Sequence, residues 1–257
     1  MPGGWDLSVF QTDKVEAGFS RAAGTYARHA RVQTAAAEWL SEWLPAERCG
    51  RALEAGAGPG IFTRHLLPWS GKLVATDASF PMCERGRAAW PQIEWRAMRA
   101  ETPTKGPWDW IFTSSMLQWV ENPPVVFSAW REMLAPKGKV VGVLFAEGSL
   151  PELRGLMGGW SPVIWRTSSE WRAAIETGGL RVVREEARRM EFGYSSTREF
   201  LRSLHGVGAT PARRLSVGAM RRLLRDYQRL HGVDGGVKAT WTFYRFEAEK
   251  AAKPLAV

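Results

Sequence analysis

The chain has 257 residues, 45% of them apolar, which is enough to bury the core of one substantial α/β domain. Its formal net charge of +9 at pH 7 favours an acidic partner such as a nucleic acid, an anionic protein or an anionic small molecule. Two cysteines and four scattered histidines argue against a disulfide framework and a zinc site, so we expect no metal.

Two features of the sequence bear on location. No run of about 18 uncharged apolar residues occurs. The N-terminal stretch MPGGWDLSVFQTDK lacks the basic-then-apolar pattern of a secretory signal. We therefore expect a cytoplasmic protein with no membrane partner.

In the first half of the chain, helical and strand patterns alternate. Residues 14–44 carry apolar residues at helical spacing and predict one or two helices that end at Pro45. Strands are predicted at RALEA, KLVATD, IEWRA, WDWIFTSS and KGKVVGVLF, and helices at PGIFTRHLL, FPMCERGRAAW and VVFSAWREML. This alternation predicts a mostly parallel sheet with helices on both faces.

After Phe145 the pattern changes. Residues 147–166 are rich in Gly, Pro and Trp. Then follow a helical pattern (SSEWRAAIETGGL), a strand pattern (RVVREEARRMEF), two helical patterns (STREFLRSL and PARRLSVGAMRRLLRDYQRL) and a last strand pattern (VKATWTFYRFEAE). We expect this half to continue the sheet, with a helical insertion before the last strand, in place of a separate domain.

A glycine-rich turn lies between the first strand and the helix after it, in the stretch EAGAGPG that starts at Glu54. Glycines in this context let a ligand approach the backbone, and the amides of the helix start face the ligand. The turn is not a P-loop, because no Lys-Ser/Thr pair follows. It also departs from the dinucleotide fingerprint, since its glycines run G-x-G-x-G. The carboxylate of Glu54 suits a ligand with an ammonium or sulfonium group better than a pyrophosphate.

A second acid, Asp77, ends the second strand, 21 residues after Gly56. An acid at this place can accept hydrogen bonds from both ribose hydroxyls of a nucleoside. Taken alone, such an acid is often only a helix cap. Together with the glycine turn, it favours a nucleoside site.

These features resemble those of class I S-adenosylmethionine-dependent methyltransferases: E-x-G-x-G-x-G, an acid that ends the second strand, and a fourth strand followed by a loop. The resemblance is closest to the malonyl-[acyl-carrier protein] O-methyltransferases of biotin synthesis and covers nearly the whole chain. The stretches that carry this closer resemblance are FSRAAGTYARHARVQ (19–33), SSMLQWVENP (114–123), LPELR (150–154) and FLRSLHGVGAT (200–210).

The resemblance implies a Rossmann-like fold and S-adenosyl-L-methionine as the cofactor. Arg99 stands where many relatives carry an acid that contacts the adenine amino group, so we expect backbone groups near Ala100, or Glu101, to contact the adenine instead. The implied cofactor-binding residues are Glu54, Gly56, Gly58, Gly60, Asp77, Ala78, Met82, Ala100, Glu101 and Ser114.

The implied acceptor is the free carboxylate of a malonyl thioester on an acyl carrier protein. A carboxylate is already ionised at neutral pH, so we expect positioning and desolvation with no catalytic side chain. Arg154 is the candidate clamp, because a carboxylate in an apolar pocket must be paired. Tyr26, Gln118 and Trp119 are candidates for the pocket wall. The alternative roles are a solvated surface arginine for Arg154 and core packing for the aromatic residues.

Basic residues gather between Arg188 and Arg229, where ten arginines face three acids, a balance of 10 − 3 = +7. Carrier proteins are typically acidic, so we expect Arg221, Arg222 and Arg225 to dock one. A solvated helical face explains the same charge pattern equally well.

Two other functions stay open at this point. One is methylation of another acceptor, either a small carboxylate such as aconitate or an RNA, although no RNA-binding motif is found and a nucleic-acid partner is not expected. The other is cofactor binding without catalysis, against which the intact Glu54, glycines and Asp77 argue.

We predict a single methyltransferase domain over residues 1–257. Its parts are N-terminal lid helices (1–44), a cofactor-binding core (45–146), a substrate-side cap with the insertion (147–236) and the final strand with the tail (237–257).

Overall fold

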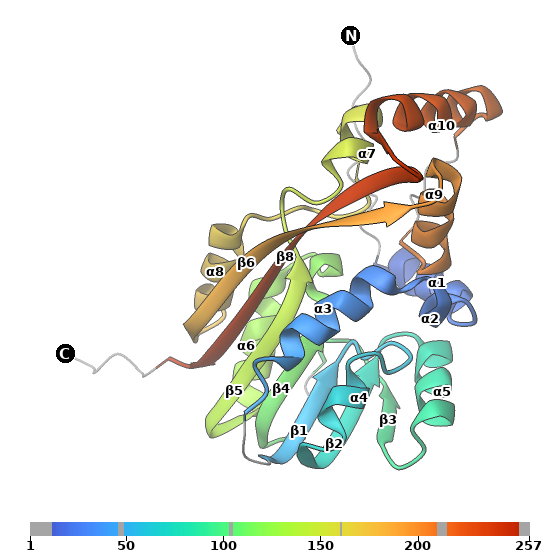
Figure 1. Ribbon diagram of the computed structural model, residues 1–257. Coiled ribbons are helices and arrows are strands. Elements are labelled where there is room, and N and C mark those ends of the chain that lie inside the picture. Colours follow the sequence, from blue (N-terminus) through green and yellow to red (C-terminus); the bar gives the residue numbers. More distant parts are fainter. Residues whose placement is uncertain (1–11, 46–48, 103–104, 160, 210–214, 252–257) are drawn as a thin grey trace.

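The structure of the protein is a computed structural model that describes residues 12–45, 49–102, 105–159, 161–209 and 215–251 (Figure 1). Its helices are α1 (Thr12–Ala22), α2 (Tyr26–His29), α3 (Arg31–Ser41), α4 (Thr63–Leu66), α5 (Phe80–Ala89), α6 (Pro123–Met133), α7 (Pro151–Leu156), α8 (Ser168–Thr177), α9 (Thr197–Gly206) and α10 (Val217–His231), with a 3₁₀ turn at Leu117–Trp119. Its strands are β1 (Cys49–Ala55), β2 (Ser70–Asp77), β3 (Glu94–Ala97), β4 (Trp108–Ser114), β5 (Leu134–Phe145), β6 (Leu180–Tyr194), β7 (Gly232–Val233) and β8 (Gly236–Lys250).

One sheet runs through the molecule in the order β3-β2-β1-β4-β5-β8-β6, and β7 pairs with β8. Strands β1 to β5 are parallel to one another, whereas β8 is antiparallel to both β5 and β6. The predicted mostly parallel α/β fold is therefore confirmed. The carboxyl ends of β1, β2 and β4 lie at one edge of the sheet, where the order reverses between β1 and β4. Ligands of open α/β sheets bind at such an edge.

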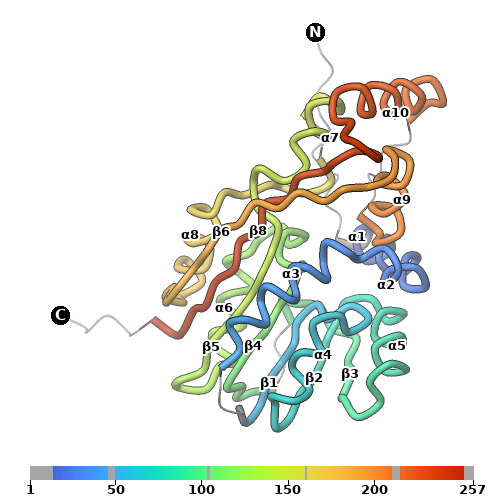
Figure 2. The backbone as a smooth tube through the Cα atoms, viewed as in Figure 1, coloured from blue at the N-terminus to red at the C-terminus, as the bar shows by residue number. Residues whose placement is uncertain are grey.

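Different helices cover the two faces of the sheet (Figures 1 and 2). Along β5, Val141 and Val143 pack in the cluster that contains the buried face of α3. Val140 and Leu144, on the alternate positions, pack with α6 and α8. This period of two is what a strand buried on both faces requires.

The second half of the chain extends the sheet beyond its parallel part. Strands β6 and β8 are 15 residues long each, and their far ends carry α7, α9 and α10 (Figure 1). Tyr227 of α10 is fully buried and donates a hydrogen bond from its hydroxyl to the Lys238 carbonyl, at 2.8 Å. α9 packs against α2, so the helices of the second half meet the N-terminal helices.

Several helices differ from the sequence prediction. Residues 14–44 form three helices, because the chain breaks at the turn around Thr25 and again at Ala30, whose φ of −83° and ψ of 36° are not helical. The helix predicted at 59–67 is a single turn, Thr63–Leu66. α7 was not predicted, since its start at Pro151 is hidden in a stretch rich in Gly and Pro.

The last helical pattern begins later than predicted. α10 starts at Val217, where the hydroxyl of Ser216 accepts a hydrogen bond from the Ala219 amide at the helix start. Residues 211–214 of that pattern lie outside the described residues. In the described ranges, every helix is too short or too polar to cross a membrane.

Candidate active site

The glycine turn after β1 has left-handed backbone at three positions, with φ of +69° at Gly56, +56° at Gly58 and +97° at Gly60. A side chain at Gly58 would meet no atom within 4 Å, so this position faces open space. A Cβ at Gly60 would lie 2.6 Å from the indole nitrogen of Trp90. Gly58 is therefore the glycine that leaves room for a ligand, whereas Gly60 is required by its backbone and by the packing of Trp90.

Glu54 is the next-to-last residue of β1 and is only 1% exposed. The Thr63 hydroxyl donates to its Oε2 at 2.6 Å, while its Oε1 has no hydrogen-bond partner in the described part of the chain. Burial raises the pKa of Glu54 to about 8, and the nearby Asp77 adds to the rise. A cation beside Oε1 would satisfy this carboxylate and return it to the ionised form.

Asp77, at the end of β2, lies against the glycine turn. Its Oδ2 accepts a hydrogen bond from the Gly58 amide at 2.9 Å, and its Oδ1 accepts one from the Ser79 amide at 2.8 Å. Burial raises the pKa of Asp77 to about 6 despite these two hydrogen bonds. Each carboxylate oxygen has a second lone pair, so Asp77 can still accept two hydroxyl groups.

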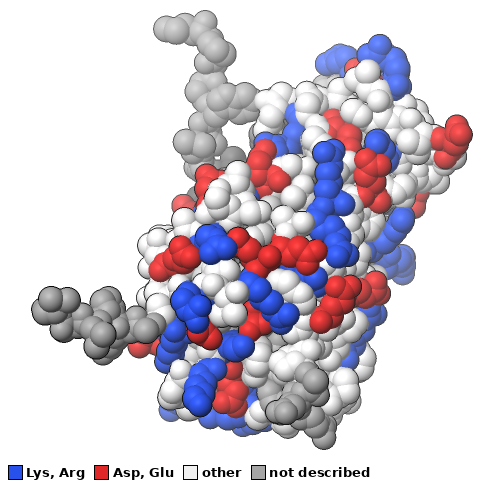
Figure 3. Space-filling view, turned by 60° about the vertical axis from the view of Figure 1, so that its left-hand side comes forward, with Lys and Arg blue, Asp and Glu red and all other residues white. Residues whose placement is uncertain are grey.

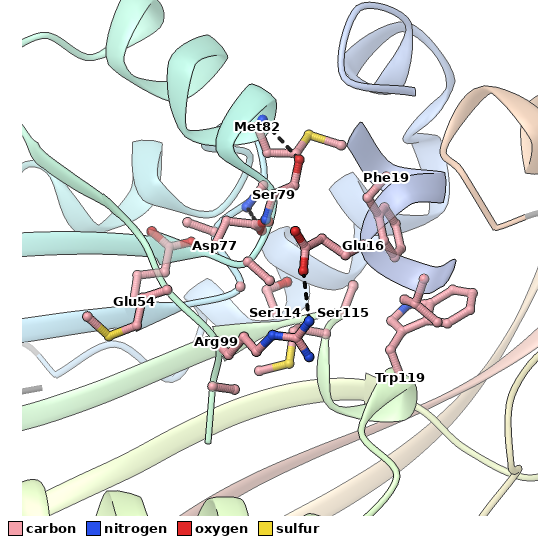
Figure 4. Close-up of a pocket in the computed structure, with 18 of the residues that line it drawn as sticks. Glu16, Phe19, Glu54, Asp77, Ser79, Met82, Arg99, Ser114, Ser115 and Trp119 are labelled. Atoms are coloured by element: carbon pink, nitrogen blue, oxygen red, sulfur yellow. Dashed lines mark hydrogen bonds and ion pairs between the residues drawn. The ribbon is translucent and has the colours of Figure 1, made fainter. Parts of the chain in front are cut away.

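One cavity gathers these groups at the carboxyl edge of the sheet, and we call it the cofactor cavity (Figure 4). Gly60 does not line it. The predicted cofactor-binding residues that line it are Glu54, Gly56, Gly58, Asp77, Ala78, Met82, Ala100, Glu101 and Ser114.

The sequence reasoning missed residues of α1 that cover this cavity. Glu16 and Phe19 line it, and Glu16 forms an ion pair with Arg99 at 3.2 Å, drawn in Figure 4. Backbone groups near Ala100, or Glu101, were expected to contact adenine, and the Ala100 carbonyl accepts a hydrogen bond from the Trp130 indole at 2.9 Å. Phe19 lies in the stretch that carries the resemblance, but no sequence signal pointed to Glu16.

A second, larger cavity of about 640 Å³ lies next to the first, and we call it the acceptor chamber. All four predicted substrate residues line it: Tyr26, Gln118, Trp119 and Arg154. Its other walls come from α7, α9, α10 and the far end of β8. The two cavities share a wall, since Phe19, Tyr26, Gln33, Ser115 and Trp119 line both.

The shared wall is held by local contacts. Phe19 and Trp119 pack edge to face with ring centroids 5.2 Å apart. Ser115 has a left-handed φ of 58°, and its carbonyl accepts a hydrogen bond from the side-chain amide of Gln118 at 2.6 Å. Burial raises the pKa of the Tyr26 phenol above its usual value, so this group stays neutral at ordinary pH. The wall thus presents neutral polar groups and aromatic rings to both cavities.

Arg154 is neither a free clamp nor a solvated surface arginine. Its side chain is 27% exposed, lines the acceptor chamber and forms an ion pair with Glu147 at 2.9 Å. Its Nε is buried without a hydrogen-bond partner in the described ranges. A carboxylate that enters the chamber would compete with Glu147 for this guanidinium.

The basic stretch of the second half divides into two kinds of surface. Over β6 and β8, arginines and acids are interspersed, as Figure 3 shows, and Arg188 pairs with Glu186 at 3.3 Å. On α10, Arg221 and Arg222 are exposed and make no ion pair within the described residues, while Arg225 pairs only with the adjacent Asp226. Of these two surfaces, the predicted docking residues therefore lie on the one whose arginines make fewer ion pairs within the described residues.

Comparison with known proteins identifies a family model and several similar proteins. The family model described as "Methyltransferase domain" matches residues 26–187. The malonyl-[acyl-carrier protein] O-methyltransferase of Magnetococcus marinus is 30% identical over 230 residues, which cover 82% of this chain and 84% of that protein. The enzyme of the same name from Pseudescherichia vulneris is 28% identical over 213 residues, covering 79% of this chain and 82% of that protein.

Solved structures share the fold. The YcgJ protein of Bacillus subtilis aligns with a TM-score of 0.62 at 14% identity, over 84% of this chain and 99% of that one. A geranyl diphosphate methyltransferase, solved with geranyl diphosphate and sinefungin, aligns with a TM-score of 0.55 at 16% identity, over 84% of this chain and 78% of that one.

The chain therefore belongs to the class I S-adenosylmethionine-dependent methyltransferases. Within that class it is similar to the malonyl-[acyl-carrier protein] O-methyltransferases. The resemblance seen in the sequence is confirmed at this level, and the protein is a methyltransferase.

Proposed function

We propose that the protein transfers the methyl group of S-adenosylmethionine to the free carboxylate of a malonyl thioester carried by an acyl carrier protein. The observation that carries the proposal is the shared wall. On one side lies a turn suited to a nucleoside, and on the other a largely apolar chamber with Arg154 in its lining. The relatives' names supply the particular acceptor.

The residues of the cofactor cavity fit this cofactor. Gly58 leaves open space beside the backbone, Asp77 has lone pairs for two ribose hydroxyls, and the unpartnered Oε1 of Glu54 suits a cationic amino-acid end. When bound, S-adenosylmethionine would supply a methyl group activated by the sulfonium next to it, and it would leave as S-adenosylhomocysteine once the S–CH3 bond has broken. Glu54 and Asp77 would hold the two ends of the cofactor and fix where that group lies.

α1 acts as the lid in this proposal. With α1 in place, the cofactor cavity measures about 120 Å³, less than the roughly 300 to 1,000 Å³ of typical ligand pockets. The ion pair of Glu16 with Arg99 and the edge-to-face contact of Phe19 with Trp119 hold α1 down. We propose that cofactor entry moves α1 outward and breaks these contacts.

On the acceptor side, Arg154 would hold one carboxylate oxygen and leave the other free to attack. No residue has to remove a proton, because the carboxylate is ionised at neutral pH. The chain contributes orientation and exclusion of water, for which the aromatic wall of Tyr26 and Trp119 is suited. The product ester is neutral, so it no longer forms an ion pair with Arg154. The ion pair between Arg154 and Glu147 can then form again.

A panel of acceptors tests the proposal. We expect methylation of malonyl carrier protein, slower methylation of malonyl-coenzyme A, and none of acetyl carrier protein, which lacks the free carboxylate. Aconitate and bulk RNA serve as competing acceptors. Preferred methylation of either one over malonyl carrier protein would contradict the assignment.

A further inference from the structure

The acceptor chamber is larger than the group that the proposed reaction modifies. At about 640 Å³ it falls within the range of pockets that enclose a drug-sized ligand, and a malonyl group would fill only a small part of it. Apolar side chains from α7, α9 and α10, among them Leu153, Leu204 and Leu223, line much of it. The chamber therefore has room for a long, mostly neutral segment behind the acyl group.

α9 places basic side chains at the rim of this chamber. Arg198, Arg202 and His205 are spaced i, i+4 and i+7, so they lie along one side of the helix. All three are exposed to solvent and also line the chamber. Phe200 and Leu204 of the same helix are buried and fix its orientation.

The two arginines are available to a ligand. Neither Arg198 nor Arg202 makes a hydrogen bond or an ion pair with the part of the chain that the structure describes. The acid next to them, Glu199, is occupied at the helix start: it accepts hydrogen bonds from the Ser195 amide at 2.6 Å and the Ser195 hydroxyl at 2.5 Å. The rim thus carries two positive charges, and the adjacent Glu199 is held at the helix start by Ser195, although Arg202 also helps to lower the pKa of this carboxyl.

We propose that Arg198 and Arg202 bind the phosphate at the base of a phosphopantetheine arm whose acyl end reaches the shared wall. This inference rests on the proposed function, because carrier proteins present acyl groups as thioesters on such an arm. The guanidinium fork matches a phosphate, and the apolar chamber suits the pantetheine segment between phosphate and thioester.

This subsite is distinct from the docking surface on α10. Arg221, Arg222 and Arg225 do not line the chamber, whereas Met220 and Leu223 of the same helix do. The α9 arginines would therefore bind the arm, and the α10 arginines would bind the protein that carries it.

Calorimetry with 4′-phosphopantetheine and with pantetheine tests the subsite without any methyl transfer. We expect the unmodified protein to bind the phosphorylated compound on the order of tenfold more tightly. The double variant Arg198→Gln, Arg202→Gln should bind both compounds equally. The matched control, Arg221→Gln with Arg222→Gln on α10, should keep the preference.

Three outcomes would overturn the subsite: equal binding of both compounds by the unmodified protein, a preference that survives in the α9 double variant, or competition by inorganic phosphate as strong as by phosphopantetheine. The last would indicate a general anion site. A protein that prefers phosphopantetheine yet methylates no malonyl thioester would retain the subsite and lose the proposed function. Methylation of malonyl carrier protein without a phosphate preference would do the reverse.

Discussion

The cofactor cavity and the acceptor chamber are formed by different kinds of chain segment. The cavity is built mainly from short turns at the carboxyl ends of neighbouring parallel strands, so each of its key residues sits beside a recognisable local pattern. The chamber is assembled from α2, α7, α9, α10 and the far end of β8, which are distant in sequence. In the proposed function, the cofactor binds in the parallel core and the added elements select the acceptor. Substitutions should separate the two functions.

The largest expected effect is on the cofactor side. Asp77→Ala removes the acceptor for two ribose hydroxyls and for the Gly58 amide, and each such charge-assisted hydrogen bond contributes roughly 1.5 to 3 kcal/mol. We expect S-adenosylmethionine affinity, measured by calorimetry, to fall about a hundredfold. Asp109→Ala is the matched control, because Asp109 also accepts a backbone amide, that of Arg51 at 2.8 Å, but does not line the cavity. Unchanged affinity in folded Asp77→Ala would remove Asp77 from the site.

Substitutions in the acceptor chamber should lower the rate of methylation and leave cofactor affinity unchanged. Arg154→Ala should lower single-turnover methylation of malonyl carrier protein by about tenfold or more at saturating cofactor, because it removes a charge-assisted contact. Arg154→Lys should fall in between, since it keeps the charge and loses the planar fork. Cofactor affinity should not change in either variant.

Glu147→Gln sharpens the same comparison. It removes the internal partner of Arg154 and should lower the KM for the malonyl substrate without improving cofactor binding. A wild-type rate in folded Arg154→Ala would refute the clamp and leave the chamber without a carboxylate contact.

A smaller effect is expected from the pH dependence of Glu54. Its folded-state pKa is raised to about 8 from an ordinary value of 4.5, so the folded, cofactor-free protein holds this proton more tightly than the unfolded chain. Stability should then fall as pH rises from about 4.5 to about 8. Glu54→Gln should remove this loss and be more stable by up to a few kcal/mol at pH 8, with no gain near pH 4.5.

Thermal unfolding at a series of pH values, without cofactor, measures this difference. Asp77, with its pKa raised to about 6, leaves a weaker dependence of the same sign in the variant. The variant should also bind S-adenosylmethionine less tightly at pH 8. Parallel stability profiles for the two proteins would show that burial does not raise the pKa of Glu54.

The smallest effect belongs to the surface of α10. Reversal of Arg221, Arg222 and Arg225 to Glu should raise the KM for malonyl carrier protein severalfold and weaken its salt dependence, because exposed charges mainly steer association. The KM for malonyl-coenzyme A should stay the same. Equal changes for both substrates would exclude α10 as a docking surface.

More of the cofactor cavity than of the acceptor chamber could be predicted from the sequence. Glu54, Gly58 and Asp77 were predicted from spacing, since a strand followed by a turn places its residues at a known edge of the sheet, and all three line the cofactor cavity. Gly60 was assigned to the same site, but it packs on Trp90, a contact between segments 30 residues apart that no spacing rule contains. Arg99 was recognised as a departure from the family pattern, and its partner Glu16 lies on a helix that only tertiary packing places over the cavity.

The chamber shows the limit more clearly. Arg154 was located through the family resemblance, but its pairing with Glu147 depends on α7, a helix that the Gly- and Pro-rich composition of its surroundings concealed. Arg198 and Arg202 looked like two more arginines in a basic stretch. Only the packing of α9 against α2 and β8 brings them to the rim of a cavity.

The central claim, that a methyl group passes from the cofactor cavity to a carboxylate in the chamber where the two cavities adjoin, is tested most directly by intact mass spectrometry. Malonyl carrier protein is incubated with the enzyme and S-adenosylmethionine, and the carrier is then weighed and fragmented. We predict the addition of one methyl group, located as an ester on the free malonyl carboxylate, and no addition to acetyl carrier protein. An unchanged mass of the malonyl carrier, or a methyl group found on the carrier polypeptide, would contradict the account.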